Sequence, residues 1–477
     1  MRIIDQIYIN GQFVTPQGSE MADLINPSNG TLLGRVRLGD AEDARRAIAA
    51  AKAALPIMAR STLAQRAEWL ERLHQAVLKR ADDAAAAIID EYGGPAQSSA
   101  WRVQHTANGF RNARSTMEQY DFVRTVGKSK VMMEGLGVVA IITPWNASSG
   151  FIANKLGMAI AAGCTAVIKP SELSAIQTQV LIESLHEAGL PPGVFNIVNG
   201  RGDVVGAEFS THPDIAKITF TGSTAVGKGI MRAAAETLKR VTLELGGKSP
   251  NILLDDADLE KAIPTAVSAA FMNNGQACIA GTRLLVPEHL LERVKAMVKA
   301  TVEAVKVGDP HDPAVTLGPL VNRKQWERVQ GYIRIGIEEG AELLTGGLGQ
   351  PEGLEQGHFV KPTVFAGVTP QMTIARDEIF GPVLSIISYR SEEEAIAIAN
   401  NTSYGLQAYV SSRDLERANR VAAQLQAGRV HINGLHDDMI TPFGGFKQSG
   451  IGREFGPFGL EAYLEPKAVL GESAQYR

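Results

Sequence analysis

Short apolar segments alternate with amphipathic segments from residue 136 onward, and this alternation constrains the fold most strongly. We expect strands at 138–142, 166–168, 194–198 and 215–220, separated by helices at 152–162, 175–188 and 204–210. Strands that alternate with helices favour a parallel, doubly wound sheet, because each helix carries the chain back across the sheet. The first half of the chain therefore predicts an α/β domain.

A second alternating section follows a boundary that we place near Gly246. Its expected strands are 250–254, 282–286, 385–389, 408–411 and 429–433, and its expected helices are 258–271, 290–305, 392–400 and 414–424. Ahead of both sections, 40–55 and 63–92 are rich in alanine and charged on one face, which is typical of amphipathic helices. The sequence thus predicts two doubly wound α/β domains.

Residues 118–135 predict a small element outside both domains. Two β-prone runs flank Val126-Gly127-Lys128, as in a β-hairpin. The tail 462–470 is apolar enough to pair with another strand. Because unpaired strands seek partners, we expect a third, discontinuous β element that makes a homo-oligomer, either a dimer or a tetramer.

The bulk composition argues against several classes of protein. The chain has 477 residues, enough for about three domains of roughly 150 residues each. Its net charge of −4, without a basic tail, argues against nucleic acid or a membrane surface as the partner. Two cysteines provide no disulfide framework, the N-terminus lacks the apolar core of a secretory signal, and no apolar run is long enough to cross a bilayer. We expect a cytoplasmic protein.

One glycine loop resembles a dinucleotide-binding fingerprint. Gly200, Gly202 and Gly206 follow an expected strand and open a helix, but the spacing between the second and third glycine is one residue too long. A plain turn followed by close helix packing explains the same pattern. This loop alone is therefore a weak indication of a nucleotide site.

Residues 222–229 nearly match a phosphate-binding P-loop. That pattern needs serine or threonine after the lysine, to supply a hydroxyl to magnesium, and Gly229 stands there instead. A nucleotide hydrolase is therefore an unfavoured alternative. The backbone N–H groups of such a loop, between a strand and a helix, can still hold a pyrophosphate, although a turn without a ligand fits the spacing equally well.

Lys169 and Glu172 follow the expected strand 166–168. In a doubly wound sheet the loops after the strand ends line the ligand crevice, where these side chains can bond to ribose hydroxyls. An ion pair on the surface is the alternative, and the sequence alone favours it.

Cys278 is the candidate nucleophile. It stands in Asn273-Asn274-Gly275-Gln276-Ala277-Cys278, a polar loop, and a thiolate attacks carbonyl carbon readily. The alternative is a buried structural cysteine, the commoner role of free cysteines. Cys164, in uniformly apolar surroundings, fits that alternative better.

Glu244 and Asn146 are candidates for the base and the oxyanion donor. Glu244 ends an apolar strand, where partial desolvation raises the pKa of a carboxyl toward that of a useful base. Asn146 also follows a strand, and its amide can donate to a developing oxyanion. A solvated loop carboxylate and a helix cap are the respective alternatives. His431 and His436 match no zinc spacing, so we expect no metal site.

Together these loops closely resemble the aldehyde dehydrogenase superfamily, over nearly the whole chain. The motifs that carry the resemblance, in the order of that family, are Pro144-Trp145-Asn146, Lys169-Pro170-Ser171-Glu172, Phe220-Thr221-Gly222-Ser223-Thr224, Glu244-Leu245-Gly246-Gly247-Lys248, Gly275-Gln276-Ala277-Cys278, Glu378-Ile379-Phe380-Gly381-Pro382 and Pro442-Phe443-Gly444-Gly445-Phe446-Lys447.

The resemblance implies a role for each matching residue. Cys278 is the implied nucleophile and Glu244 the base, while Asn146 and the backbone N–H of Cys278 form the oxyanion hole. Lys155 matches a lysine of the active site. The implied cofactor residues are Lys169 and Glu172 at the adenine ribose, Trp145 and Ser223 at the pyrophosphate, Glu378 at the nicotinamide ribose and Phe380 beside the nicotinamide, with Ser171, Gly202, Gly206, Phe220, Thr221, Gly222, Leu245 and Gly246 around them.

The resemblance also implies the domain roles and the reaction. Residues 1–117 and 136–246 form the cofactor-binding domain, 247–446 the catalytic domain, and 118–135 with 458–477 the oligomerisation element. The implied reaction oxidises an aldehyde to a carboxylic acid with NAD⁺, through a cysteine thiohemiacetal and a thioester that a glutamate helps to hydrolyse. A catalytically silent structural or binding protein of the same fold is the alternative.

Two details concern specificity. Glu172 favours NAD⁺ over NADP⁺, because a carboxylate at the ribose repels a 2′-phosphate, and NADP⁺ stays as the alternative cofactor. The presence of Glu244 favours hydrolysis over transfer of the acyl group to coenzyme A. Ala147-Ser148-Ser149 departs from the aromatic-proline pattern that often follows Asn146 in the family, which leaves the aldehyde unidentified.

Overall fold

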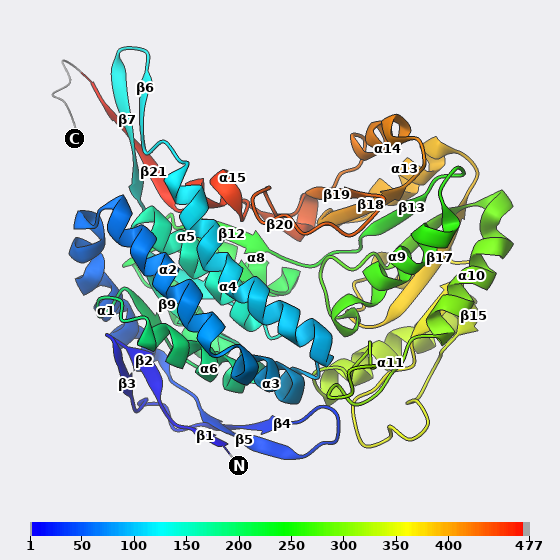
Figure 1. Ribbon diagram of the computed structural model, residues 1–477, viewed down its shortest axis with the longest axis horizontal. Coiled ribbons are helices and arrows are strands. Elements are labelled where there is room, and N and C mark those ends of the chain that lie inside the picture. The colour runs from blue at the N-terminus through cyan, green and yellow to red at the C-terminus, as the bar shows by residue number, and fades with distance from the viewer. Residues whose placement is uncertain (1, 471–477) are drawn as a thin grey trace.

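The computed structural model describes residues 2–470 and contains two α/β lobes with a projecting β element (Figure 1). The predicted fold class is confirmed. In the first lobe eight strands lie in the order β20-β12-β11-β8-β9-β10-β2-β3, and those from β12 to β10 are parallel. Their bounds are β20 Gly450–Ile451, β12 Arg240–Glu244, β11 Ile215–Thr221, β8 Val138–Ile142, β9 Thr165–Lys169, β10 Phe195–Ile197, β2 Ile7–Ile9 and β3 Gln12–Val14.

Both faces of this sheet are buried, which explains why its strands read as continuous apolar runs. Val138 and Ala140 of β8 pack into one hydrophobic cluster, and Val139 and Ile141 pack into another on the opposite face. The helices of this lobe are α1 Ala41–Arg60, α2 Leu63–Lys79, α3 Ala81–Tyr92, α4 Ala96–Glu118, α5 Ser148–Ala162, α6 Ala175–Glu187, α7 Ala207–Thr211 and α8 Thr224–Ala235.

The second lobe has a seven-stranded sheet in the order β15-β16-β17-β14-β13-β18-β19, parallel except for β15. The strands are β15 Glu342–Thr345, β16 Thr363–Ala366, β17 Val383–Tyr389, β14 Arg283–Pro287, β13 Pro250–Leu253, β18 Gln407–Ser411 and β19 Arg429–Ile432. Its helices are α9 Leu259–Phe271, α10 Leu291–Glu303, α11 Arg323–Glu338, α12 Thr373–Arg376, α13 Glu392–Asn400 and α14 Leu415–Ala422.

The predicted hairpin and tail form one antiparallel sheet that projects from the first lobe (Figure 1). Strand β21 Leu464–Val469 pairs with β7 Ser129–Gly135, which pairs with β6 Val123–Val126. The expected pairing of the tail with the hairpin region is therefore confirmed up to residue 470. The predicted oligomerisation element extends to residue 477, and 471–477 lie outside the described residues.

Several sequence expectations were wrong or incomplete. The single helix expected over 63–92 is two helices, because Arg80 has φ −113° and ψ 30° and breaks the hydrogen-bond ladder. The helix expected over 204–210 is a π-helical turn, Gly202–Gly206, followed by α7. Helices α4 and α11 and the N-terminal sheet, β1 Arg2–Ile4, β5 Leu32–Arg37 and β4 Met21–Ile25, were not predicted.

The segment after the second lobe returns to the first. Strand β20 pairs antiparallel with β12, and helix α15 Gly456–Glu461 then packs on α4 and α5. Residues 447–457, which the sequence left without a domain, thus complete the edge of the first sheet beside Glu244. None of the helices in residues 2–470 has the length and hydropathy needed to span a bilayer.

Candidate active site

Most predicted site residues follow the carboxyl ends of the parallel strands of the first sheet. Asn146 follows β8, Lys169 ends β9, Thr221 ends β11 and Glu244 ends β12. Ligands of doubly wound sheets bind at this edge. Cys278 comes from the second lobe, on the loop before β14, so the site lies between the lobes.

The loop of Cys278 packs directly against the loop of Glu244. Gly247 lies so close to the Cys278 carbonyl that a Cβ there would collide with it. Cys278 is partly accessible. Burial raises the pKa of its thiol, and the carboxyls of Glu378 and Glu244 raise it further. The structure therefore brings the predicted nucleophile and base together.

Glu244 is a buried carboxyl without a hydrogen-bond partner. The residue is 2% exposed, and neither Oε1 nor Oε2 has a partner among residues 2–470. Burial raises the pKa of Glu244 well above its ordinary value, and the neighbouring Glu454 raises it further. A Cβ at Gly444 would lie 2.7 Å from Oε1, so only glycine leaves room for this carboxyl. The solvated loop carboxylate considered as an alternative does not describe Glu244.

Lys155 lies in a buried ion pair close to Glu244. Its Nζ donates to the Glu454 carboxylate and, at 3.0 Å, to Thr219 Oγ1. The charge of Lys155 lowers the pKa of Glu244, whereas that of Glu454 raises it. The predicted lysine therefore lies within electrostatic range of the predicted base.

Asn146 is tied to the nucleophile loop. Its Nδ2 donates to the carbonyl oxygen of Gln276, two residues before Cys278, at 2.9 Å. An amide nitrogen has two N–H groups, so one remains for a ligand oxygen. Helix α5 begins at Ser148 without a side-chain cap, which excludes the capping role considered for Asn146. Ala147, Ser148 and the next residue form the start of this helix.

Glu378 and Phe380 lie beside the base loop. Glu378 Oε1 accepts from the Gly247 N–H at 3.1 Å, and a Cβ at Gly246 would lie 2.5 Å from Oε2. Burial raises the pKa of Glu378 to about 7. Phe380 has a φ of 64°, which is strained for a bulky side chain, and its ring meets that of Trp145 edge-on at 5.5 Å between centroids. Glu378 is therefore held by the base loop and Phe380 by Trp145, and the Glu378 carboxyl is close enough to Cys278 to affect its pKa.

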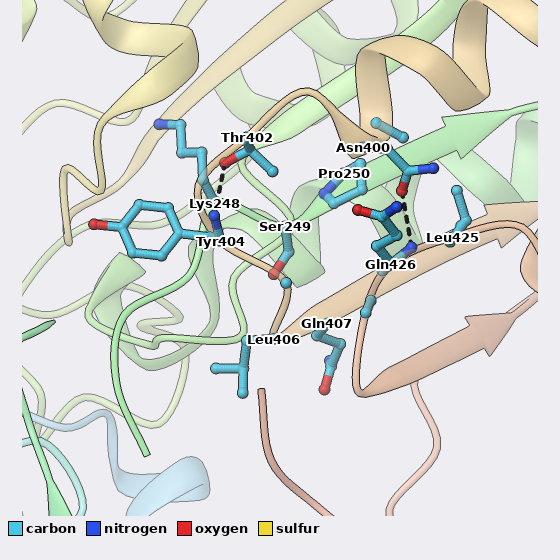
Figure 2. A pocket seen from close by; sticks show the side chains of 14 residues that line it. Lys248, Ser249, Pro250, Asn400, Thr402, Tyr404, Leu406, Gln407, Leu425 and Gln426 are labelled. Atoms are coloured by element: carbon cyan, nitrogen blue, oxygen red, sulfur yellow. Dashed lines mark hydrogen bonds between the residues drawn. The ribbon is translucent and has the colours of Figure 1, made fainter. Parts of the chain in front are cut away.

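Lys248 directly follows the base loop, and the sequence analysis gave it no role. Its Nζ is buried and has no hydrogen-bond partner within residues 2–470. Burial lowers the pKa of Lys248 to about 7, while Glu378 acts in the opposite direction. Lys248 lines a small pocket, where Figure 2 shows its side chain extending away from Gln407 and Leu425. That pocket has about 10 Å³ of free volume, room for roughly one water molecule, so it does not hold the substrate.

Lys169 and Glu172 lie together at the end of β9. Their side chains approach to 3.6 Å between Nζ and Oε2, with Lys169 buried and Glu172 half-exposed. Ser171 caps the short turn Glu172–Ser174 through its Oγ. A Cβ at Gly206 would lie 3.9 Å from the Lys169 side chain, so the first glycine loop borders this pair. The ion pair considered as an alternative is present, and its exposed carboxylate still faces outward.

The second glycine loop connects β11 to the start of α8 and lies beside the end of the base strand. Ser223 Oγ accepts a backbone N–H of the first turn of α8 at 3.4 Å, and the Gly222 N–H donates to the Glu244 carbonyl at 3.0 Å. The Phe220 ring fills the space beside Gly222, and the buried Thr221 Oγ1 has no hydrogen-bond partner in the described part of the chain. A loop that opens a helix N-terminus suits a phosphate group.

Leu245 and Gly202 are two further predicted cofactor residues. Leu245 packs against Gly227 of α8, and Gly202 faces open space.

His431 and His436 stack on each other at 6.0 Å, and the His436 N–H donates to His431 Nδ1 at 3.1 Å. Within residues 2–470 no cluster of three or more His, Cys, Asp or Glu side chains is arranged to hold a metal ion.

Three residues near Asn146 were missed by the sequence analysis. Arg102 of α4 donates to the Asn146 carbonyl, Asn273 donates to the same oxygen at 3.0 Å, and Tyr92 of α3 donates to the Asn273 carbonyl at 2.9 Å. Asn273 opens the loop of Cys278, but the sequence analysis gave it no role of its own. Tyr92 and Arg102 lie on helices with no catalytic signature, and no sequence signal identified them.

Comparisons with known proteins give one consistent result. The profile of the aldehyde dehydrogenase family matches residues 13–469. The chain is 47% identical to the 3-succinoylsemialdehyde-pyridine dehydrogenase of a Pseudomonas species, over 99% of both chains. It is 42% identical to a putative aldehyde dehydrogenase of Staphylococcus haemolyticus, also over 99% of both chains.

Solved structures agree. A mutant of aldehyde dehydrogenase C from Pseudomonas syringae, in complex with NAD⁺ and octanal, superposes with a TM-score of 0.97 at 45% identity, covering 99% of this chain and 98% of that one. The NAD⁺ complex of the Bacillus cereus aldehyde dehydrogenase has a TM-score of 0.94 at 40% identity, covering 98% and 96%. The predicted resemblance is confirmed, and the chain belongs to the aldehyde dehydrogenase family.

Proposed function

We propose that this protein oxidises an aldehyde to a carboxylic acid with NAD⁺, using Cys278 as the nucleophile, Glu244 as the base and Asn146 in the oxyanion hole. The observation that carries the assignment of residues is the buried, unpartnered carboxyl of Glu244 against the Cys278 loop. A carboxyl in that state costs stability, and natural proteins retain such groups where function needs them. Family membership sets aside the nucleotide hydrolase and supports catalysis over a silent role.

The residues along the sheet edge fit a dinucleotide. Lys169 and Glu172 suit the hydroxyls of the adenine ribose, the N-terminus of α8 suits the pyrophosphate, and Glu378 suits the nicotinamide ribose. When bound, NAD⁺ accepts the hydride of the aldehyde. Glycine at 246 leaves space that a Cβ would take from Glu378.

The chain's own groups perform the remaining steps. The Cys278 sulfur bonds to the aldehyde carbon, and its proton leaves the site. Asn146 and the Cys278 backbone N–H hold the resulting oxyanion of the thiohemiacetal. After hydride loss the thioester remains on Cys278, and Glu244 takes a proton from a water that attacks the thioester carbon. The bond between the carbon and the sulfur then breaks, the carboxylic acid leaves, and the proton held by Glu244 passes to the sulfur and restores the thiol.

The substrate is an aldehyde, and we propose that its chain is predominantly uncharged. The relatives support this choice, since one is crystallised with octanal and another is named for a pyridine-bearing aldehyde. A panel of aliphatic, aromatic and ω-carboxylated aldehydes, assayed by NADH formation, ranks the classes by kcat/KM. A preference for carboxylated aldehydes would contradict the proposal.

Exposure of the first ribose-binding carboxylate supports NAD⁺ as the cofactor. Glu172 keeps 40% of its side chain exposed beside Lys169, and a negative charge there disfavours a 2′-phosphate. We expect kcat/KM for NAD⁺ to exceed kcat/KM for NADP⁺ by at least about tenfold. The substitution E172Q should lower this preference for NAD⁺. A wild-type kcat/KM that is higher for NADP⁺ than for NAD⁺ would contradict the assignment.

The assembly and domain roles are also proposals. Val123 and Val126 are exposed on the projecting sheet, which supports a homo-oligomer, either a dimer or a tetramer. We also propose that the protein acts in the cytoplasm. The division into a cofactor-binding domain, a catalytic domain and an oligomerisation element follows the three β regions. Sedimentation velocity of the full chain tests the assembly, and a monomer at micromolar concentration would contradict it.

The central test asks whether the reaction needs the Cys278 sulfur. We expect the wild-type protein to form NADH when it is given NAD⁺ and an aldehyde. We expect C278A to form no NADH while still binding NAD⁺. Substantial NADH formation by C278A would remove the proposed mechanism. C164A is the matched control, because Cys164 is fully buried in the hydrophobic core of the first lobe. This substitution should leave the rate of NADH formation unchanged.

A further inference from the structure

Asn146 is held at both ends by the loop that carries the nucleophile. Its side-chain amide donates to the Gln276 carbonyl at 2.9 Å, and its own carbonyl accepts from Asn273 Nδ2 at 3.0 Å. The same Asn273 nitrogen donates to the Gln276 carbonyl at 3.0 Å. These bonds therefore tie the position of Asn146 to that of the loop that carries Cys278.

Tyr92 fixes this loop from α3. Its hydroxyl donates to the Asn273 carbonyl at 2.9 Å and accepts from Gln276 Nε2 at 3.0 Å, and the residue is fully buried. Asn273 and Asn274 have φ values of 55° and 58°, a left-handed conformation that costs about 1 kcal/mol or more for each non-glycine residue. The contacts of Tyr92 help to hold the loop in this strained shape.

Arg102 connects Tyr92 to Asn146. Its guanidinium lies over the Tyr92 ring, 4.7 Å from the centroid, and donates to the Asn146 carbonyl. Burial lowers the pKa of Arg102, and within residues 2–470 no carboxylate is among the groups that act on its guanidinium. A cation this close to the oxyanion donor, without a counter-ion, favours negative charge nearby.

We propose that Arg102 and Tyr92 are positioning residues that hold Asn146 in register with Cys278 and thereby strengthen the oxyanion hole. The inference rests on the proposed roles of Asn146 and Cys278 and adds two helical residues to them. Neither side chain touches the reacting atoms; Arg102 acts through the Asn146 peptide and Tyr92 through Asn273 and Gln276.

The first experiment measures the rate of the NADH burst, that is, of NADH formation in the first turnover. We expect R102M, which keeps the length of the side chain and removes its charge and donors, to slow the burst by about 10- to 100-fold, as loss of supporting hydrogen bonds does at other sites. R102K should recover part of that loss. Y92F removes one hydroxyl and should cost roughly threefold to tenfold. R111M, a change of an exposed arginine on the same helix, is the matched control and should behave as wild type.

The second experiment asks whether Arg102 acts through Asn146. In a double-mutant cycle the effect of R102M should largely vanish in an N146A background, because the positioned group is gone. An independent structural role would leave the two effects additive. The aldehyde KM and NAD⁺ affinity should change by less than about threefold in R102M.

Three outcomes would overturn the inference: a wild-type burst in R102M and Y92F, additivity with N146A, or a rise in KM for carboxylated aldehydes alone, which would make Arg102 a substrate anchor. If R102M does not fold, as judged by thermal unfolding, Y92F and its cycle with N146A decide. A burst that survives in C278A would instead refute the proposed function. Loss of the burst in C278A and N146A but not in R102M or Y92F would refute only this inference.

Discussion

The two flanks of Cys278 differ in how their polar groups are satisfied. On one flank Asn146 is bonded through both its side chain and its carbonyl. On the other flank Glu244 is buried, and neither of its carboxyl oxygens is bonded to any residue that the structure describes. An unpartnered buried acceptor costs about 1–3 kcal/mol of folding stability. The Glu244 flank therefore destabilises the fold, whereas the hydrogen bonds of the Asn146 flank stabilise it.

This difference matches the work that each flank performs. An oxyanion donor is effective when it is already in place before charge develops. A base must accept a proton from water, so it has to change its charge and bond to a group that is absent at the start. The comparison therefore separates formation of the thioester, assigned to the Asn146 flank, from its hydrolysis, assigned to the Glu244 flank.

Removing the base should have the largest effect. We expect E244Q to lower the steady-state rate by about 10²–10⁴-fold while the first turnover still produces NADH, because only hydrolysis loses its base. Intact-mass spectrometry should then show an acyl group on Cys278. Steady turnover close to that of wild type would show that another group activates water, and the contrast between the flanks would fail.

Removing the oxyanion donor should affect the other half of the reaction. N146A is expected to slow the NADH burst by about 10²–10³-fold, without accumulation of acyl-enzyme, since the thioester forms slowly. Stopped-flow absorbance of NADH measures the burst. If N146A instead accumulated a thioester, the assignment of the flanks would have to be reversed.

The pH dependence should identify the base flank alone. Because burial and Glu454 raise the pKa of Glu244, its ionised form is lost at a higher pH than for an ordinary glutamate. Thioester hydrolysis should therefore rise with pH through that raised pKa, and fall by about tenfold per unit below it. A pH profile of hydrolysis after rapid acylation tests this, and E244Q should flatten the acid limb.

The smallest effect is expected from a change that contacts neither Asn146 nor the Glu244 side chain. In G246A the new Cβ would lie 2.5 Å from Glu378, so Glu378 must shift and the KM for NAD⁺ should rise by roughly tenfold, equivalent to about 1.4 kcal/mol. The ratio of burst rate to hydrolysis rate should stay near that of wild type. A change in that ratio would mean that the two flanks are coupled through Gly246.

Much of the fold was predictable because the parallel strands are buried on both faces. Strand β8 was placed at its observed bounds, since five consecutive apolar residues have no alternative in a doubly wound sheet. The break at Arg80 was not predictable, because no glycine or proline marks it and tertiary packing decides it. The short N-terminal strands carry too few residues for a periodic pattern.

The candidate site was predictable where residues stand in motif loops and not where helices support them. Glu244 and Cys278 stand beside glycines that the structure uses for close approach, as at Gly247. Arg102 and Tyr92 reach the site through contacts across 44 and 184 positions, from Arg102 to Asn146 and from Tyr92 to Gln276. Side-chain direction on those helices, rather than local sequence, decides such contacts.

The pairing of β20 with β12 has a consequence for synthesis on the ribosome. Glu244 emerges roughly 200 residues before Gly450, a delay of about 10–40 s at ~5–20 residues per second. During that interval the nascent first lobe has an open strand edge at the base, and Lys155 has not yet met Glu454. Residues 450–454 therefore close the edge of the sheet and supply the ion-pair partner of Lys155 beside the base. A chain that ends before them exposes an unpaired strand, to which a chaperone can bind.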